Sequence, residues 1–254
     1  MSMAGYTLVI PAWNDGYRVA QTLKRYLPVF DASKVPIEII IVSDGNYNDL
    51  ERAVAPFRKR VKVQHHPRRL GKGGAIMAGF CAAGYDRVGF VDSDGPVPPE
   101  EVLAMFDDLS SNCCVIASRR LPQSRVVSPQ AFSRRLLGKT WSLLVRGLFL
   151  LPIRDTQCGA KFFRKECVDE VSPKVAVASW AFDVSLLFHL REAGFTLKEY
   201  PVTWADEGSS KLEVATDVPQ MLITLLGVRA MNLPLRRLVP NKWIRSFTAH
   251  LSEP

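Results

Sequence analysis

The sequence contains few cysteines and few histidines. Its 254 residues include four histidines and five cysteines. None of them is spaced like a zinc site or a disulfide framework, and no nucleophilic triad is evident. The cysteines therefore indicate a reducing compartment. The N-terminus enters a strand pattern without a charged start and an apolar signal core, so we do not expect export.

Acidic residues are missing from two long segments. Between Leu109 and Arg154 there is no Asp or Glu, but there are eight bases, which equal the whole net charge of +8. Val218–Ser252 also lacks acids and carries five bases. Segregated positive charge needs an anionic partner, which could be nucleic acid, phospholipid or a phosphorylated substrate. A nucleic-acid platform is disfavoured, because the bases are not interleaved with aromatic residues and no recognised module is present.

The first acid-free segment contains a helical pattern over Phe132–Leu150. Four of its residues, Arg135, Lys139, Ser142 and Arg146, form one narrow polar stripe. Most other positions are apolar, and Trp141 adds an aromatic that favours a membrane interface. This pattern is typical of a helix that lies in the headgroup layer of a membrane. The alternative is a core-packed helix with a solvated basic edge.

The second acid-free segment approaches the length of a membrane span. Val218–Leu238 is mostly apolar, but Gln220 and Arg229 interrupt it. These interruptions favour an interfacial or shallowly inserted hairpin over a clean span.

The first half of the chain alternates between strand and helix patterns. Apolar runs predict strands over 6–12, 37–43, 61–64, 87–91 and 113–117. Helical patterns lie between them, over 17–27, 49–57, 74–83 and 99–109. Further on, we expect a helix that ends near Ala193 and a strand over 198–204. Such alternation predicts an α/β fold with a mostly parallel sheet and helices on both faces.

Two aspartates one residue apart follow the strand predicted over 87–91. Because alternate residues of a strand point the same way, we expect Asp92 and Asp94 to lie on one side. Two such carboxylates repel each other unless a cation lies between them, and Mg²⁺ or Mn²⁺ suits oxygen ligands. The alternative is a solvated turn. Asn14, Asp15 and Asp44 also follow strands, which predicts a ligand site at one edge of the sheet.

Two further features bear on a site. Gly71–Ala75 precedes a helical pattern, where glycines and a helix N-terminus favour a phosphate, although a plain loop-to-helix turn is equally compatible. Asp183 lies in an apolar patch, so we expect it to have a partner, either in a site or in the core.

The motifs occur in an order that resembles a known family. They are PAWND, IVSDG, GKGGA, VDSDG, IASR, DTQCGAKFF, SWAFDV and YPVTW, over about residues 5–212. This order resembles glycosyltransferase family 2, and within it the dolichyl-phosphate glucose and mannose synthases. GKGGA, DTQCG and SWAFDV are more similar to the glucosyl branch. Mannosyl enzymes share the same scaffold, so either sugar is compatible with the motifs.

The resemblance implies an inverting hexosyltransferase of the GT-A fold. It would use GDP-mannose or UDP-glucose, Mn²⁺ or Mg²⁺, and dolichyl phosphate as acceptor, and it would supply lipid-linked glycan for protein N-glycosylation. The catalytic domain would span residues 1–212, with an interfacial helix at about 132–151 inserted in it. Residues 213–254 would form membrane-associated helices, at the cytoplasmic face. The sequence does not indicate an oligomeric state.

The resemblance also implies roles for individual residues. Asp92 and Asp94 would bind the metal, with Asp94 the firmer ligand. The donor would contact Pro11, Ala12, Asn14, Asp15, Asp44, Gly71, Lys72, Asp92, Ser93, Trp180 and Asp183. The acceptor phosphate would contact Arg119, Arg134, Arg135 and Lys139. Catalytic roles would fall to Asp92, Asp94, Arg119, Gln157 and Lys161.

Some positions depart from the family pattern, and other acceptors stay open. Asp15 stands where glutamate is usual, Ser43 replaces the first of two aspartates, and Pro96 replaces a glutamine of mannosyl relatives. A lipid-linked oligosaccharide is an alternative acceptor. A processive polymerase is disfavoured, because the Q-x-x-R-W motif is missing. A nucleotidyltransferase is also disfavoured, since its glycine-rich loop usually follows the first strand.

Overall fold

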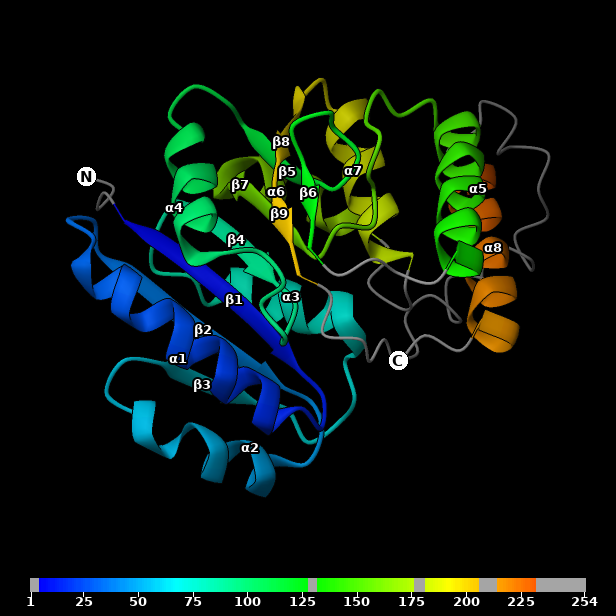
Figure 1. The fold of residues 1–254 in the computed structure, drawn as a ribbon. Coiled ribbons are helices and arrows are strands. Elements are labelled where there is room, and N and C mark those ends of the chain that lie inside the picture. Colours follow the sequence, from blue (N-terminus) through cyan, green and yellow to red (C-terminus); the bar gives the residue numbers. More distant parts are fainter. Residues whose placement is uncertain (1–4, 128–131, 176–180, 206–213, 232–254) are drawn as a thin grey trace.

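The computed structural model describes residues 5–127, 132–175, 181–205 and 214–231 (Figure 1). Within them, seven strands form one sheet in the order β3-β2-β1-β4-β7-β5-β8. The strands are β1 (Tyr6–Ala12), β2 (Ile37–Ser43), β3 (Lys62–His65), β4 (Arg87–Val91), β5 (Cys114–Ser118), β7 (Ala160–Arg164) and β8 (Leu197–Pro201). Only β7 runs antiparallel to its neighbours, β4 and β5. The predicted mixed, mostly parallel sheet is therefore confirmed.

Helices cover both faces of this sheet, as expected. They are α1 (Gly16–Ala32), α2 (Tyr47–Val54), α3 (Gly71–Cys81), α4 (Pro99–Asp108), α5 (Phe132–Phe149), α6 (Lys165–Val171), α7 (Phe182–Glu192) and α8 (Val214–Met231). The short 3₁₀ helices η1 (Ala55–Phe57) and η2 (Ser172–Lys174) follow α2 and α6. A separate two-stranded ribbon joins β6 (Arg125–Val126) to β9 (Thr203–Trp204).

The alternation of side chains along the central strand divides the core between the two faces. In β1, Leu8 and Ile10 pack in the cluster that contains residues of α1, α2 and α4. Val9, between them, packs in the cluster that contains residues of α3, α6 and α7. Because both faces are covered, β1 is apolar on both sides, as parallel strands usually are.

A third cluster holds α5 and α8 beside α7 (Figure 1). Val145 and Phe149 of α5 meet Leu225 and Val228 of α8 in this cluster. Among the described residues, no helix is both long enough and apolar enough to cross a membrane. The expectation of membrane-interface helices therefore stays a prediction.

Several boundaries differ from the sequence-based expectation. Helix α3 begins at Gly71 rather than Gly74, and α8 begins at Val214, within the segment 213–254 where helices were expected. The single strand expected over 198–204 is divided, because β8 pairs with β5 while β9 pairs with β6. The predicted division at residues 212 and 213 lies outside the described residues.

Candidate functional site

The two aspartates lie in a tight turn at the carboxyl end of β4. The strand ends at Val91, and the amide of Gly95 donates to the carbonyl of Asp92 at 2.9 Å. Gly95 has a φ of 53°, a backbone conformation that favours glycine. The turn, rather than the strand alternation that we expected, therefore positions Asp92 and Asp94.

The ends of the neighbouring strands contact this turn and one another. Ser93 Oγ donates to Asp15 Oδ2 at 2.5 Å, which joins the end of β1 to the turn. Asn14, with a φ of 50°, accepts through Oδ1 from the amide of Asn46, just beyond β2. The structure thus brings together Asn14, Asp15 and Ser93, as predicted. Pro11 and Ala12 lie at the end of β1 beside them.

Asp44 caps helix α3. Its Oδ2 accepts from the amides of Leu70 and Gly71, both at 2.8 Å. The sequence favoured a phosphate at this helix N-terminus, but two of its amides are bound by this carboxylate. The predicted contacts of Asp44 and Gly71 with the donor stay predictions.

The turn at Asp92–Gly95, called the aspartate turn below, adjoins a cluster of four charged side chains: Lys72, Asp92, Lys161 and Asp183. Lys72 Nζ lies 2.9 Å from Asp92 Oδ1 and 3.5 Å from Asp183 Oδ2. Lys161 Nζ lies 2.6 Å from Asp183 Oδ1 and donates to the carbonyl of Cys158, also at 2.6 Å. Both ammonium groups lie over the Phe90 ring, 5.4 and 5.5 Å from its centroid. The cluster supplies the partners that the sequence required for Asp183.

The charges in this cluster stabilise one another. Burial alone would raise the pKa of Asp183, but Lys161 and Lys72 hold that pKa below its ordinary value. Burial would lower the pKa of Lys72, but Asp183 and Asp92 raise it above its ordinary value. Asp183 and Lys72 therefore carry their charges at neutral pH.

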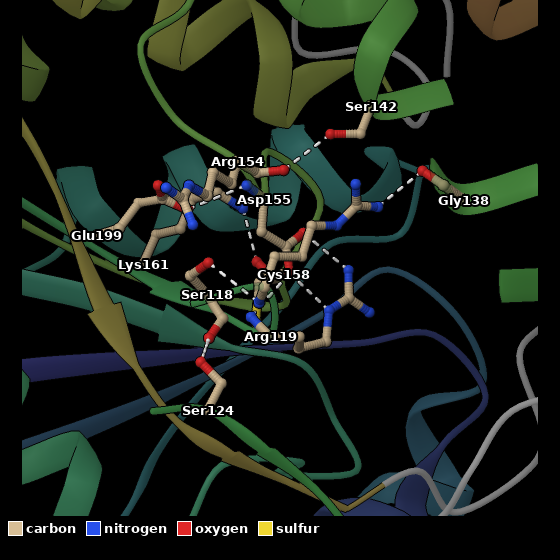
Figure 2. A network of polar contacts seen from close by, with 11 residues as sticks. Ser118, Arg119, Ser124, Gly138, Ser142, Arg154, Asp155, Cys158, Lys161 and Glu199 are labelled. Atoms are coloured by element: carbon tan, nitrogen blue, oxygen red, sulfur yellow. Dashed lines mark hydrogen bonds and ion pairs between the residues drawn. The ribbon is translucent and has the colours of Figure 1, made fainter. Parts of the chain in front are cut away.

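Arg119 follows β5 and is held by Asp155 (Figure 2). Its Nε and Nη2 donate to Oδ2 and Oδ1 at 2.7 and 2.9 Å, and its amide donates to Oδ2 at 3.0 Å. The amide of Asp155 donates to Glu199 Oε1 at 3.1 Å. The Arg119 guanidinium lies 4.7 Å from the centre of the Trp204 ring. The sequence named Arg119, but it named neither Asp155 nor Trp204.

The segment 155–159 joins this ion pair to the aspartate turn. At one end Asp155 binds Arg119, and at the other end the carbonyl of Gly159 accepts from the amide of Asp92 at 2.9 Å. Three buried polar atoms near this segment have no hydrogen-bond partner among the described residues: Thr156 Oγ1, Gln157 Nε2 and Trp204 Nε1. Gln157 is one of the predicted catalytic residues, and its amide nitrogen has capacity to bind a ligand.

Lys161 lies elsewhere than its expected role requires. Its side chain is fully buried, at 0% exposure, in the middle of the sheet. An acceptor phosphate could reach it only if its pair with Asp183 separated. We therefore interpret Lys161 as the residue that fixes Asp183.

Three of the four basic residues predicted on the acceptor side lie on α5. The backbone positions of Arg134, Arg135 and Lys139 are part of this helix, while their side chains, and all of Trp180, lie outside the described residues. Two hydrogen bonds hold α5 near the Arg119–Asp155 pair (Figure 2). Arg120 Nη2 donates to the carbonyl of Gly138 at 2.7 Å, and Ser142 Oγ donates to the carbonyl of Arg154 at 2.8 Å.

A divalent metal fits the aspartate turn only in part. Among the described residues there is no group of three or more His, Cys, Asp or Glu side chains that could hold a metal ion. Asp92 and Asp94 provide carboxylate oxygens, and the Lys72 ammonium shows that Asp92 accepts a cation here. Mg²⁺ usually binds one or two carboxylates and takes its remaining ligands from substrate phosphates and water. The residues thus fit a metal that is shared with a diphosphate.

Comparison with known proteins shows the family. Residues 7–172 match the family described as Glycosyl transferase family 2. The chain is 26% identical to a dolichyl-phosphate beta-glucosyltransferase of Trichomonas vaginalis, over 87% of this chain and 70% of the relative. It is 27% identical to the dolichyl-phosphate beta-glucosyltransferase of Homo sapiens, over 88% of this chain and 74% of the relative.

Solved structures show the same fold. Glucosyl-3-phosphoglycerate synthase from Mycobacterium tuberculosis, in complex with Mn²⁺ and uridine-diphosphate-glucose, has a TM-score of 0.67 at 17% identity. The match covers 89% of this chain and 79% of that one. A complex of the same enzyme with Mg²⁺ and uridine-diphosphate has a TM-score of 0.65 at 16% identity. These likenesses confirm the expected α/β fold of the GT-A type.

Proposed function

Because the chain belongs to glycosyl transferase family 2, we propose that it transfers glucose from UDP-glucose to a polyprenyl phosphate of the dolichyl type. The names of the relatives support the sugar and the acceptor. The nucleotide-sugar complexes of the structural neighbour support a uridine donor and a divalent metal. GDP-mannose, which the motifs left open, becomes the alternative donor.

One structural observation carries this proposal. The segment 155–159 binds the aspartate turn through Gly159 at one end. At its other end it binds Arg119 through Asp155. A metal at the turn would neutralise the charge that develops on a diphosphate leaving group. Arg119 would bind a phosphate at the opposite end of the same segment. The site therefore suits a reaction between two phosphate-bearing molecules.

The residues would act mainly by holding two anions in place. Asp155 fixes Arg119 through Nε and Nη2, while Nη1 takes no part in this pair. An arginine fixed in this way can bind a phosphate without losing further conformational freedom. The acceptor phosphate is already an anion, so the reaction does not require a strong general base.

We propose peripheral attachment to the cytoplasmic face of a membrane, and the exposed apolar side chains of α5 and α8 support the membrane contact and a lipid-bound acceptor. Leu143 and Leu144 of α5, and Ile223 and Leu226 of α8, are exposed. Arg146 of α5 is exposed on the same helix. Exposed leucines beside a base favour contact with an anionic membrane surface. Attached there, the protein would meet a membrane lipid rather than a soluble acceptor.

A transfer assay tests this proposal. The protein would be incubated with Mn²⁺, with vesicles that contain dolichyl phosphate, and with radiolabelled UDP-glucose or GDP-mannose. We expect labelled lipid from UDP-glucose, and none from the Asp92→Asn variant. Transfer from GDP-mannose alone would contradict the sugar assignment. Labelling only of an added lipid-linked oligosaccharide, or only of 3-phosphoglycerate, would contradict the acceptor assignment.

A further inference from the structure

Lys72 lies directly beside Asp92, the carboxylate that the proposed metal would bind. Its ammonium nitrogen lies 2.9 Å from Asp92 Oδ1, and its side chain is 19% exposed. At this distance the contact is a charge-assisted hydrogen bond. The carboxylate on which a divalent ion would bind therefore already has a cationic partner within the protein.

The cluster is electrically balanced without a metal. Lys72 and Lys161 face Asp92 and Asp183, so two positive charges meet two negative charges. A divalent ion on Asp92 would add two positive charges directly beside the Lys72 ammonium. Like charges at such short range repel each other, and more strongly in a partly buried site than in water. The ion and the Lys72 ammonium would therefore compete for the same oxygen.

Asp183 provides a second position for Lys72. Its Oδ2 lies 3.5 Å from the Lys72 nitrogen, and its Oδ1 is held by Lys161. Asp183 is 2% exposed, so its carboxylate is fixed within the core. Lys72 can thus leave Asp92 and keep a counter-ion, with its charge still directed toward the donor site.

We propose that Lys72 is the internal counter-ion of Asp92 in the empty site, and that a divalent metal binds only by displacing it toward Asp183. This inference rests on the proposed metal-dependent transfer. It implies that the protein without nucleotide binds a metal weakly. The diphosphate of the donor brings the additional negative charge that makes the exchange favourable.

Titration with Mn²⁺ alone tests the competition, and it needs no activity. The electron paramagnetic resonance signal of free Mn²⁺ reports how much of the ion is bound. We expect Lys72→Met to bind Mn²⁺ at least about tenfold more tightly than the wild type, because a neighbouring positive charge has been removed. Lys62→Met is the matched control, since Lys62 is 71% exposed and pairs with Glu38. It should leave the Mn²⁺ affinity unchanged.

Two further variants test whether the gain in Mn²⁺ affinity comes from the loss of Lys72 beside Asp92. The gain in affinity should disappear in Lys72→Met/Asp92→Asn, and a gain that persists would place the ion elsewhere and overturn the proposal. Lys72→Gln retains a polar group near Asp183 and should also bind Mn²⁺ more tightly, which covers the case in which the methionine variant does not fold. Unchanged or weaker affinity in a folded Lys72 variant would overturn the proposal as well.

The nucleotide provides a separate measurement. In the wild type, UDP should strengthen Mn²⁺ binding more than it does in Lys72→Met, because the variant has no ammonium to displace. If UDP strengthened Mn²⁺ binding equally in both proteins, the proposed displacement of Lys72 by the metal would be contradicted. If UDP had no effect on either protein, the proposed donor would be wrong, whereas the comparison with Mn²⁺ alone would still decide the role of Lys72.

Discussion

Arg119 and Asp155 form a bidentate ion pair in which a single carboxylate accepts three hydrogen bonds from one residue. Asp155 is 1% exposed, and the pair connects the end of β5 to the segment that precedes β7. Two side chains from distant parts of the sequence thus fix the direction of the guanidinium. An arginine oriented in this way is prepared to bind a phosphate.

Replacing Arg119 by lysine should lower kcat/KM for transfer by about a hundredfold. Lysine retains the charge but cannot form the fork that holds both oxygens of Asp155. Transfer assays with the variant and with Arg125→Lys, a change at an exposed arginine in β6, measure the effect. If Arg119→Lys matched the control, the bidentate geometry would have no role in the reaction.

Replacing Asp155 by asparagine should destabilise the protein in a manner that depends on pH. Arg119 lowers the pKa of Asp155 from its ordinary value of 3.8 to about 2, against the opposing effect of burial. A lowered pKa in the folded state contributes stability that is present above about pH 4 and is lost as the pH falls toward 2. The difference between the two values corresponds to about 2 kcal/mol.

Urea unfolding at pH 7, 5, 4 and 3 measures this contribution. The difference in unfolding free energy between the wild type and Asp155→Asn should be largest at neutral pH and should shrink below pH 4. Asp169→Asn is the control, since Asp169 is 55% exposed and pairs with Lys165. A difference that stayed constant down to pH 3 would show that the Asp155 charge is not the cause.

The sequence predicted six of the seven strands of this sheet, because the strand pattern is local, but it did not predict β7. The alternation of Leu8, Val9 and Ile10 between two buried faces makes β1 apolar throughout, and that signal can be read without the fold. The strand order could not be read in the same way. Insertion of β7 between β4 and β5 brings together residues far apart in the chain, so the pairing of Lys161 with Asp183 could not be read from local patterns.

The sequence predicted site residues that belong to short motifs. It did not predict which side chains from different motifs would contact one another. Asp92, Asp94 and Arg119 belong to short motifs, and the two aspartates lie at the end of β4, where they were expected. Asp155 and Trp204 lie in the motifs DTQCGAKFF and YPVTW, but the motifs gave them no role, since their importance comes from contact with Arg119. Lys72 was expected to contact the donor, but the sequence could not show that it would meet Asp92.

Removing either aspartate of the turn should remove the dependence of transfer on metal. We expect Asp92→Asn and Asp94→Asn each to lower kcat by at least about a hundredfold, because charge on the leaving group would no longer be neutralised. Assays over a series of Mn²⁺ concentrations, with and without EDTA, measure this. Asp31→Asn, at an exposed ion pair of α1, should behave as wild type. Near-normal activity of the double variant in EDTA would contradict a metal role.

Charges placed on the exposed face of α5 and α8 should release the protein from membranes. Leu143 and Leu226 are 67% and 50% exposed, so Leu143→Glu/Leu226→Glu should fold normally. Each leucine that is buried in lipid contributes about 1.5 kcal/mol or more, so binding should weaken by at least about tenfold. Cosedimentation with anionic liposomes measures it, and Tyr17→Glu, at a 74% exposed residue of α1, is the control. Equal binding by the two variants would exclude this face as the membrane contact.

Gly159 leaves room for the carboxylate of Asp92. A Cβ atom at this position would lie 1.9 Å from Asp92 Oδ2 and 2.4 Å from its Cγ. In Gly159→Ala the carboxylate must therefore rotate or the turn must move, at a cost of about 1–3 kcal/mol. We expect Mn²⁺ affinity and kcat to fall toward the values of Asp92→Asn, although the aspartate itself is still present.

Gly147→Ala is the matched control, because no heavy atom lies within 4 Å of the added Cβ. This change in the interior of α5 should leave transfer unaltered and should stabilise the protein by about 0.5–1 kcal/mol, since alanine loses less conformational entropy than glycine in a helix. Thermal unfolding measures the effect of each glycine variant on stability separately from its effect on transfer. Full activity of a folded Gly159→Ala protein would show that the reaction does not need the Asp92 carboxylate in the position that the structure gives it.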